Sequence, residues 1–334
     1  MTFGPTKLGL VGLGWWGQVL LKSALDHPDT YKFTAAAGPS AADKEVATIA
    51  GLSHFATLDD LLDRGEVEAV VLATPHSMHA SQVTTCAERG VAVYTEKPLA
   101  LTVNAARAAI EACNRAGVTL GIGTDKRFLP SVEALTRLVR DGTLGRVLHV
   151  EANYSNDNMS GGLSGSWRND PREAPGGALT GPALHVLDAV VSLVGPPESV
   201  RAQLLTHPDL PGVVDTLRID LQLSSRVTGS LSSVRGVPDY FRIAVYGTKG
   251  WAEVLGFGVL RVSESGSPTS WTTFPGDLRA GELLQRFAEG LATGSSFPVT
   301  TTSMLHTTAS LEAAVRSIET GGAIRISPDL EVSP

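Results

Sequence analysis

The feature that most constrains this chain is a glycine-rich turn placed directly after a short apolar segment. Residues 7–11 are apolar apart from their first residue, and Gly12-x-Gly14-x-x-Gly17 follows them at the start of a helical pattern. The first glycine allows the turn, the second lets a ligand approach the backbone, and the third lets the helix touch the strand. Free N–H groups at the helix start favour a phosphate. The alternative is a purely structural turn.

Short apolar runs then alternate with helical patterns as far as residue 123. This alternation predicts right-handed crossovers and a parallel, doubly wound α/β sheet. The predicted strands are residues 7–11, 31–37, 68–73, 91–95 and 118–123, and the predicted helices are 14–25, 41–50, a short one ending at 63, 78–89 and 102–115.

Beyond residue 123 longer segments alternate polar and apolar residues, which is typical of strands with one solvated face. We therefore predict a Rossmann domain over residues 1–123 and a second α+β domain over residues 124–334, with a large, open, mostly antiparallel sheet. Its predicted strands are 147–154, 199–205, 216–223, 227–234, 240–246 and 250–254, and its predicted helices are 130–140, 179–194, 282–291 and 302–320.

Composition excludes several classes of protein. The net charge of -7 argues against a nucleic-acid surface. The histidines and the two cysteines have no metal-ligand spacing, so no metal is expected. The apolar stretch at residues 8–21 contains several glycines and precedes no cleavage-site pattern, and no stretch is long enough to span a bilayer. We expect a cytoplasmic protein with neither a leader nor a membrane segment.

Polar residues follow two of the predicted strands, where an open parallel sheet binds ligands. Thr74-Pro75 and His79 come after the strand at 68–73, and Glu96-Lys97-Pro98 come after the next one. Lys97 is a cation at the crevice that can polarise a substrate oxygen and relay its proton. Each residue also has a simpler, structural interpretation. Lys97 could form a salt bridge with Glu96, and His79 could simply begin a helix.

The end of the second strand lacks a residue that such a crevice usually has. An acidic residue there would bind the adenosine ribose, but the position is Gly38. Without a carboxylate to repel a 2′-phosphate, and with Ser40 available to bind one, we expect NADP to be accepted at least as well as NAD.

Taken together, these motifs resemble the Gfo/Idh/MocA oxidoreductases, and the resemblance extends over nearly the whole chain. Further matching segments are Arg127-Phe128, Gly145-Arg146-Val147 and Gly247-Thr248-Lys249-Gly250. The resemblance implies hydride transfer between NAD(P) and a carbinol carbon, a second domain whose open sheet forms dimer or tetramer contacts, and a Lys–Pro bond that is often cis. The residues expected at the cofactor are Gly12, Gly14, Trp15, Trp16, Gly17, Ser40, Thr74, Pro75, His79, Glu96, Lys97 and Pro98.

The resemblance also places Lys97 at the family's catalytic lysine and His185 at its acid/base histidine. The family's aspartate, four residues before that histidine, is Gly181 in this chain. We expect Asp125, which follows the strand at 118–123, to be the best substitute carboxylate. Asp188 is an alternative partner for the imidazole, and Thr180 offers a hydroxyl nearby. The simpler interpretation is that His185 is an ordinary core residue.

The segment from Tyr154 to Pro175 is expected to cover the substrate. Asn156, Trp167 and Arg168 offer a hydrogen bond, an aromatic platform and a cation, and complete the expected substrate set with Lys97, Asp125, Thr180 and His185. Arg127 is expected to be structural.

The sequence therefore predicts an NAD(P)-dependent dehydrogenase or reductase that acts on a small polyhydroxylated ring: a sugar, a cyclitol or a cyclic diol. Two alternatives remain. One is an epimerase or eliminase that retains its cofactor and oxidises the substrate transiently, and the other is an inactive NAD(P)-binding sensor, for which Gly181 is the best argument.

Overall fold

The structure, a computed structural model, describes residues 4–157, 167–210, 214–223, 226–276 and 280–330. These residues form two compact units. The first contains the described residues up to Gly123 together with 280–305, and the second contains 124–276 and 306–330.

The first unit is built on a six-stranded sheet in the order β3-β2-β1-β4-β5-β6, with every neighbouring pair parallel. This is the doubly wound order that places a crevice beyond the carboxyl ends of β1 and β4. All residues of β4 and β5 are buried, as expected for strands covered on both faces. The strands are β1 (Thr6–Val11), β2 (Tyr31–Ala37), β3 (Ser53–Phe55), β4 (Ala69–Leu72), β5 (Ala92–Thr95) and β6 (Leu120–Ile122).

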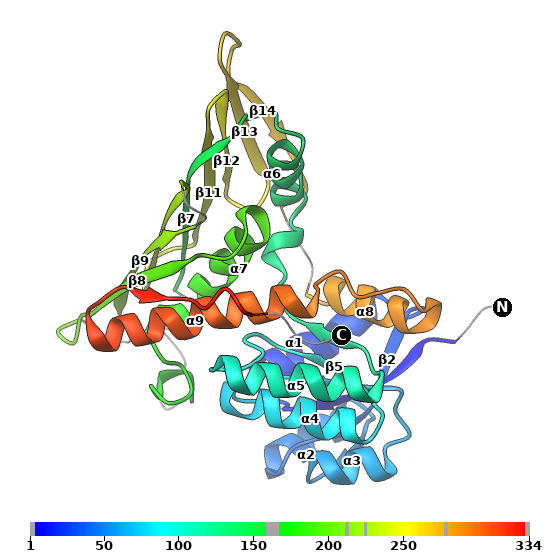
Figure 1. Cartoon of the computed structure of the whole chain (residues 1–334). Coiled ribbons are helices and arrows are strands. Elements are labelled where there is room, and N and C mark those ends of the chain that lie inside the picture. The colour runs from blue at the N-terminus through cyan, green and yellow to red at the C-terminus, as the bar shows by residue number, and fades with distance from the viewer. Residues whose placement is uncertain (1–3, 158–166, 211–213, 224–225, 277–279, 331–334) are drawn as a thin grey trace. The chain divides into compact units, whose positions relative to one another are not determined.

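Helices connect these strands, and their ends follow local sequence rules (Figure 1). The Thr102 side chain accepts a hydrogen bond from the N–H of Ala105 at the start of α5, and Gly117 ends that helix in the left-handed conformation. The helices of this unit are α1 (Trp15–Ser23), α2 (Ala41–Ile49), α3 (Leu58–Arg64), α4 (His79–Glu88), α5 (Val103–Ala116) and α8 (Glu282–Thr293).

Helix α8 comes from the far end of the chain, so the expected second domain over residues 124–334 is divided between the two units. Phe287 of α8 lies edge-on to Tyr94 of β5, with ring centroids 5.7 Å apart, and Phe297 completes an aromatic group with both rings. Gly121 has no side chain to interfere, since a Cβ there would lie 2.7 Å from the Phe287 ring. Aromatic packing therefore makes this late segment part of the Rossmann unit.

The second unit is built on a nine-stranded sheet in the order β14-β13-β12-β11-β7-β10-β9-β8-β15. Only the pair β7 and β10 is parallel among its described ladders, which confirms the predicted mostly antiparallel sheet. The strands are β7 (Val147–Ser155), β8 (Ser199–Thr206), β9 (Asp215–Gln222), β10 (Thr228–Arg235), β11 (Tyr240–Gly247), β12 (Gly250–Leu255), β13 (Val259–Glu264), β14 (Ser270–Thr273) and β15 (Ile324–Arg325).

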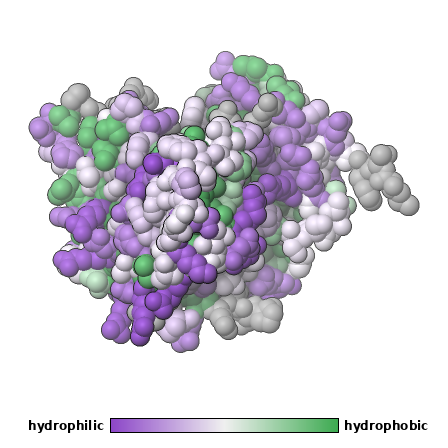
Figure 2. Space-filling model, turned by 90° about the horizontal axis from the view of Figure 1, so that it is seen from above, coloured by the Kyte–Doolittle hydropathy of each residue, from purple (hydrophilic) through white to green (hydrophobic). Residues whose placement is uncertain are grey.

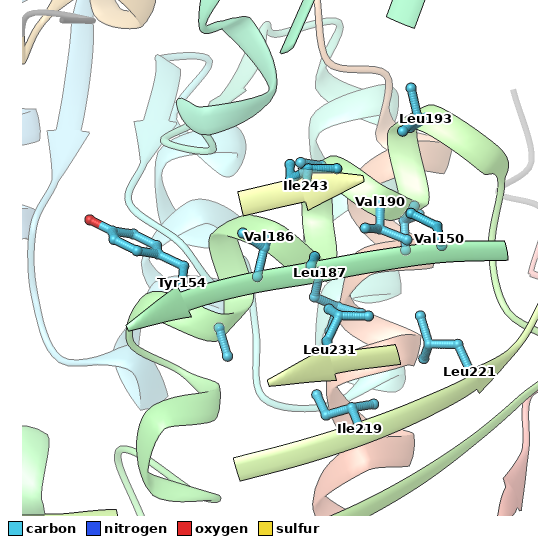
Figure 3. Packing of buried hydrophobic residues seen from close by; sticks show 14 of the residues in the cluster. Val150, Tyr154, Val186, Leu187, Val190, Leu193, Ile219, Leu221, Leu231 and Ile243 are labelled. Carbon is cyan, nitrogen blue, oxygen red and sulfur yellow. The ribbon is translucent and has the colours of Figure 1, made fainter. Parts of the chain in front are cut away.

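The core of the second unit lies between one face of this sheet and α7 (Pro182–Val194), an almost wholly buried helix. Figure 3 shows Val186, Leu187 and Val190 of α7 against Val150 and Leu231 of neighbouring strands. Burial alternates along β9 and β10, so the other face of the sheet carries the polar residues. The remaining helices are α6 (Pro130–Arg140) and α9 (Thr301–Thr320).

The surface combines polar and apolar residues. On the face shown in Figure 2, hydrophilic residues predominate and hydrophobic ones form separate groups between them. Among the described residues, the structure contains no helix long and apolar enough to cross a bilayer.

Candidate active site

The glycine turn after β1 has the geometry that the sequence predicted. Gly12 has φ +92°, and a Cβ there would lie 2.6 Å from the carbonyl oxygen of Ala73. A Cβ on Gly17 would overlap the carbonyl oxygen of Gly12, so the third glycine allows helix and turn to touch. A Cβ on Gly14 would meet nothing within 4 Å. That open space at the start of α1 fits a pyrophosphate that approaches the backbone.

The two tryptophans of this turn have different surroundings. Trp15 is 57% exposed, whereas Trp16 is half-buried, and their ring centroids are 5.4 Å apart. Trp15 is therefore the ring with a free surface for a ligand, and Trp16 is the packing residue.

The loops after β4 and β5 are tied together by His79. Its Nδ1 lies 2.7 Å from the carbonyl oxygen of Pro98, and its Nε2 lies 2.9 Å from the carbonyl oxygen of Thr74. Thr74 also donates its hydroxyl to Gln82, and Pro75 follows it in the same loop. The His79 side chain is fully buried, so within the protein it holds these two loops together.

Lys97 follows β5 and is half-buried, and its bond to Pro98 is cis, as the resemblance implied. The carboxylate of Glu96 accepts a hydrogen bond from the backbone N–H of Lys97, 3.4 Å away. Gly123 makes room for that carboxylate, since a Cβ there would lie 2.6 Å from it. The Glu96 side chain therefore packs against the end of the neighbouring strand β6.

Ser40 is less available than the sequence suggested. Its hydroxyl donates to Oδ2 of Asp43 at 2.5 Å and accepts from the N–H of Asp43 at 3.1 Å, so Ser40 caps α2. The expectation that no carboxylate lies at the end of β2 is also wrong, because Asp43 brings one there from the helix.

In the second unit, Asp125 lies beside His185. Oδ1 of Asp125 is 3.0 Å from Nδ1 of His185, and Oδ2 accepts a hydrogen bond from Nζ of Lys126 at 2.7 Å. Burial alone would raise the pKa of the Asp125 carboxyl, but the charge of Lys126 and the adjacent His185 hold that pKa well below its usual range. Asp125 is therefore an ionised partner for the imidazole. The two side chains are 29% and 17% exposed, so solvent reaches both.

Tyr154 extends this group from the end of β7. The Tyr154 ring stands edge-on to the His185 ring, with centroids 6.0 Å apart. Burial raises the pKa of the Tyr154 phenol. The expected substrate residue Asn156 is itself buried, and its backbone is hydrogen-bonded to Val234 and Gly236.

Asp188, the alternative partner for His185, has another role. It accepts hydrogen bonds from Nε of Arg127 at 2.6 Å and from the hydroxyl of Thr307 at 3.0 Å, and Nη2 of Arg127 makes a second, shorter contact. Both side chains of the Arg127–Asp188 pair are buried. The prediction that Arg127 is structural is confirmed.

The remaining expected residues lie along the segment that leads to α7. Thr180 is buried, and the guanidinium of Arg168 lies over the Trp167 ring, 4.2 Å from its centroid. Residues 158–166, in the middle of the expected covering segment, lie outside the described residues. At Gly181 a Cβ would meet only the carbonyl oxygen of Ala178, at 3.6 Å. An aspartate side chain therefore has room to start there.

The sequence argument did not expect Lys126 in this group, and it named Tyr154 only as the start of the covering segment. The usable signal for Lys126 was its place directly after Asp125 beyond a strand end. Tyr154 had no comparable signal, because an aromatic residue in a strand of alternating polarity usually indicates a core position.

The first unit has a doubly wound sheet, an open glycine turn and a lysine at a strand end, and the second unit has a carboxylate–histidine pair. These features together are typical of nicotinamide-dependent oxidoreductases. The model "Oxidoreductase family, NAD-binding Rossmann fold" matches residues 6–124, and the model "GFO/IDH/MocA C-terminal domain" matches residues 132–253.

Known proteins agree with this assignment. The rhizopine catabolism protein MocA of Rhizobium meliloti is 30% identical over 75% of this chain and 78% of its own length. D-xylose 1-dehydrogenase (NADP(+)) 2 of Haloferax volcanii is 27% identical over 98% of this chain and 100% of its own. The crystal structure of the aldose-aldose oxidoreductase of Caulobacter crescentus superposes with a TM-score of 0.82, at 26% identity, over 96% of this chain and 100% of that one. This chain belongs to the Gfo/Idh/MocA family and is an NAD(P)-dependent oxidoreductase.

Proposed function

We propose that this protein transfers a hydride between NAD(P) and a carbinol or carbonyl carbon of a small polyhydroxylated ring: a sugar, a cyclitol or a cyclic diol. The single observation that carries the proposal is the contact between Asp125 and His185, because it supplies an acid/base group with its own ionised partner. The relatives' names, which include a xylose dehydrogenase and an inositol 2-dehydrogenase, support the substrate class.

Lys97 and His185 divide the proton chemistry in this proposal. The ammonium of Lys97 polarises the substrate oxygen, and His185 takes up or returns the proton of that oxygen. A carboxylate beside Nδ1 favours a proton on that nitrogen, which leaves Nε2 for the exchange. When bound, the nicotinamide ring accepts or donates the hydride.

Asp125 replaces the family's aspartate, whose position in this chain is Gly181. It reaches the histidine from the segment after β6, whereas the family's aspartate precedes the histidine on the same helix. It remains ionised because Lys126 and His185 outweigh the effect of burial. In this proposal, Asp125 supplies the carboxylate of the relay from a different part of the chain.

We further propose a homodimer or homotetramer assembled through the nine-stranded sheet. Large apolar side chains on its strands are exposed, which suits a contact with a second copy. They are Leu148 of β7, Leu205 of β8, Tyr240 of β11 and Trp271 of β14.

The test is a panel of sugars, cyclitols and dihydrodiols assayed with NAD and with NADP, in both directions. We expect a redox product formed in step with the absorbance of the reduced nicotinamide. Substrate conversion without net change in that absorbance would indicate a cofactor-retaining epimerase or eliminase. Nucleotide binding without turnover of any compound would indicate a sensor, and both outcomes would overturn the proposal.

Lys97→Ala is the first variant to examine with a substrate from that panel. Turnover should fall below detection because the oxygen is no longer polarised, while NAD(P)H titration should still show binding. A variant with near-normal kcat would contradict the assigned role of Lys97.

A further inference from the structure

The end of β2 is missing a side chain, and another residue occupies the vacant volume. Gly38 is buried, and a Cβ built on it would lie 2.6 Å from Cβ of Asp43 and 2.7 Å from its Oδ2, with Cγ also in contact. A carboxylate at position 38 would begin in this same volume. The Asp43 carboxylate therefore fills the space in which a side chain at position 38 would begin, next to the end of β2.

The position of Asp43 is fixed by the start of α2. Oδ2 of Asp43 accepts a hydrogen bond from the N–H of Ser40 at 3.0 Å and from its hydroxyl at 2.5 Å, and Asp43 N–H donates to that hydroxyl. This reciprocal arrangement is a capping box. The end of β2 is held as well, since Nε2 of His54 lies 3.0 Å from the carbonyl oxygen of Gly38.

One oxygen of the carboxylate is left for a ligand. The carboxylate of Asp43 accepts both hydrogen bonds from Ser40 through Oδ2. Within the described part of the chain, Oδ1 accepts no hydrogen bond. Ribose hydroxyls donate to such an oxygen, whereas the extra negative charge of a 2′-phosphate is repelled by it. The hydroxyl of Ser40 already serves Asp43, so it has less to offer a phosphate.

We propose that Asp43 is the specificity-determining carboxylate of the cofactor site: it substitutes for the acidic residue missing at Gly38, binds the adenosine ribose and selects NAD over NADP. The inference rests on the proposed NAD(P) chemistry and reverses the preference that the sequence alone suggested. The exposed cation Lys44, one residue further along α2, is the group that would favour a 2′-phosphate instead.

Equilibrium binding tests this inference without any substrate. NADH and NADPH are titrated into the wild-type protein and into Asp43→Asn, and the two Kd values are compared. We expect the wild type to bind NADH about tenfold or more tightly than NADPH, and Asp43→Asn to lose most of that ratio, because a charge-assisted hydrogen bond and a repulsion both disappear.

Asp60→Asn is the control, because Asp60 has the equivalent position at the start of α3, where it exchanges hydrogen bonds with Thr57 and also pairs with Arg64. It should leave the NADH to NADPH ratio unchanged. Ser40→Ala removes capping bonds but keeps the Asp43 charge, so it should retain the NADH preference even if Asp43→Asn folds poorly.

Equal or tighter binding of NADPH by the wild type would overturn the inference, as would an unchanged ratio in Asp43→Asn. Failure of both nucleotides to bind the wild type would instead refute the NAD(P) chemistry itself. The two failures are therefore distinguishable.

Discussion

Two pairs of ionisable side chains join the same two segments of the second unit, yet their surroundings are opposite. Asp125 meets His185, and Arg127, two residues later, meets Asp188, one turn further along α7. The first pair remains partly exposed, whereas both side chains of the second are buried, and Asp188 is also bonded to Thr307.

The difference teaches how one helix carries both scaffold and chemistry. The buried pair Arg127–Asp188, whose carboxylate oxygens accept hydrogen bonds, holds the segment after β6 against α7 and leaves no position for a substrate. It thereby fixes the position of the neighbouring pair Asp125–His185, which stays open to solvent. Separate measurements of stability and turnover should distinguish the two.

The largest expected effect is on stability. Asp188→Ala leaves the Arg127 guanidinium buried without its carboxylate, which should cost about 3–5 kcal/mol of unfolding free energy. Urea unfolding at neutral pH measures it. Asp220→Ala, which breaks an exposed pair with Arg218, is the control and should change little. Equal losses in the two variants would refute the structural role of the buried pair.

The next effect is on catalysis. His185→Ala should lower kcat roughly 10²–10⁴-fold, the range for loss of one acid/base group, while the melting temperature changes much less than in Asp188→Ala. Steady-state kinetics on the panel substrate measures it, with His207→Ala as a histidine control in the same unit. Near-normal turnover would contradict the acid/base role of His185 and indicate that it is a packing residue.

The smallest effect concerns pH. Asp125 has a lowered pKa in the folded protein, so its contribution to stability is complete above the unfolded value of about 4 and is lost as the pH falls below it. Asp125→Asn should therefore lose less unfolding free energy than the wild type on acidification through that range. Parallel urea titrations at several pH values measure this, and identical pH dependence in both proteins would contradict the assignment.

The sequence was sufficient for five strands of the parallel sheet and for most strands of the second sheet, because periodicity reports burial. It missed the short strands β3 and β15, and also β13 and β14. All four residues of β14 are exposed, so no apolar alternation marks it. Helix α7 begins at Pro182, later than the predicted 179, because a short turn over Gly177–Leu179 precedes it.

For the site, the sequence offered candidate residues but not their pairing. It offered Asp125 and Asp188 as partners for His185, and only the course of the chain decides between them. It also treated the end of β2 as lacking a carboxylate, because Asp43 lies five positions beyond Gly38 and reaches back through a helix cap. Contacts of this kind depend on local backbone geometry, which residue spacing alone does not encode.

The return of α8 to the Rossmann sheet means that this enzyme cannot be divided by cutting its chain once. A fragment ending at Gly123 would carry every strand of that sheet but neither Phe287 nor Phe297, and Tyr94 would lose its aromatic neighbours. Recombination with a relative would have to exchange two separate stretches together. In this protein, the nucleotide-binding half is a unit of structure without being a unit of sequence.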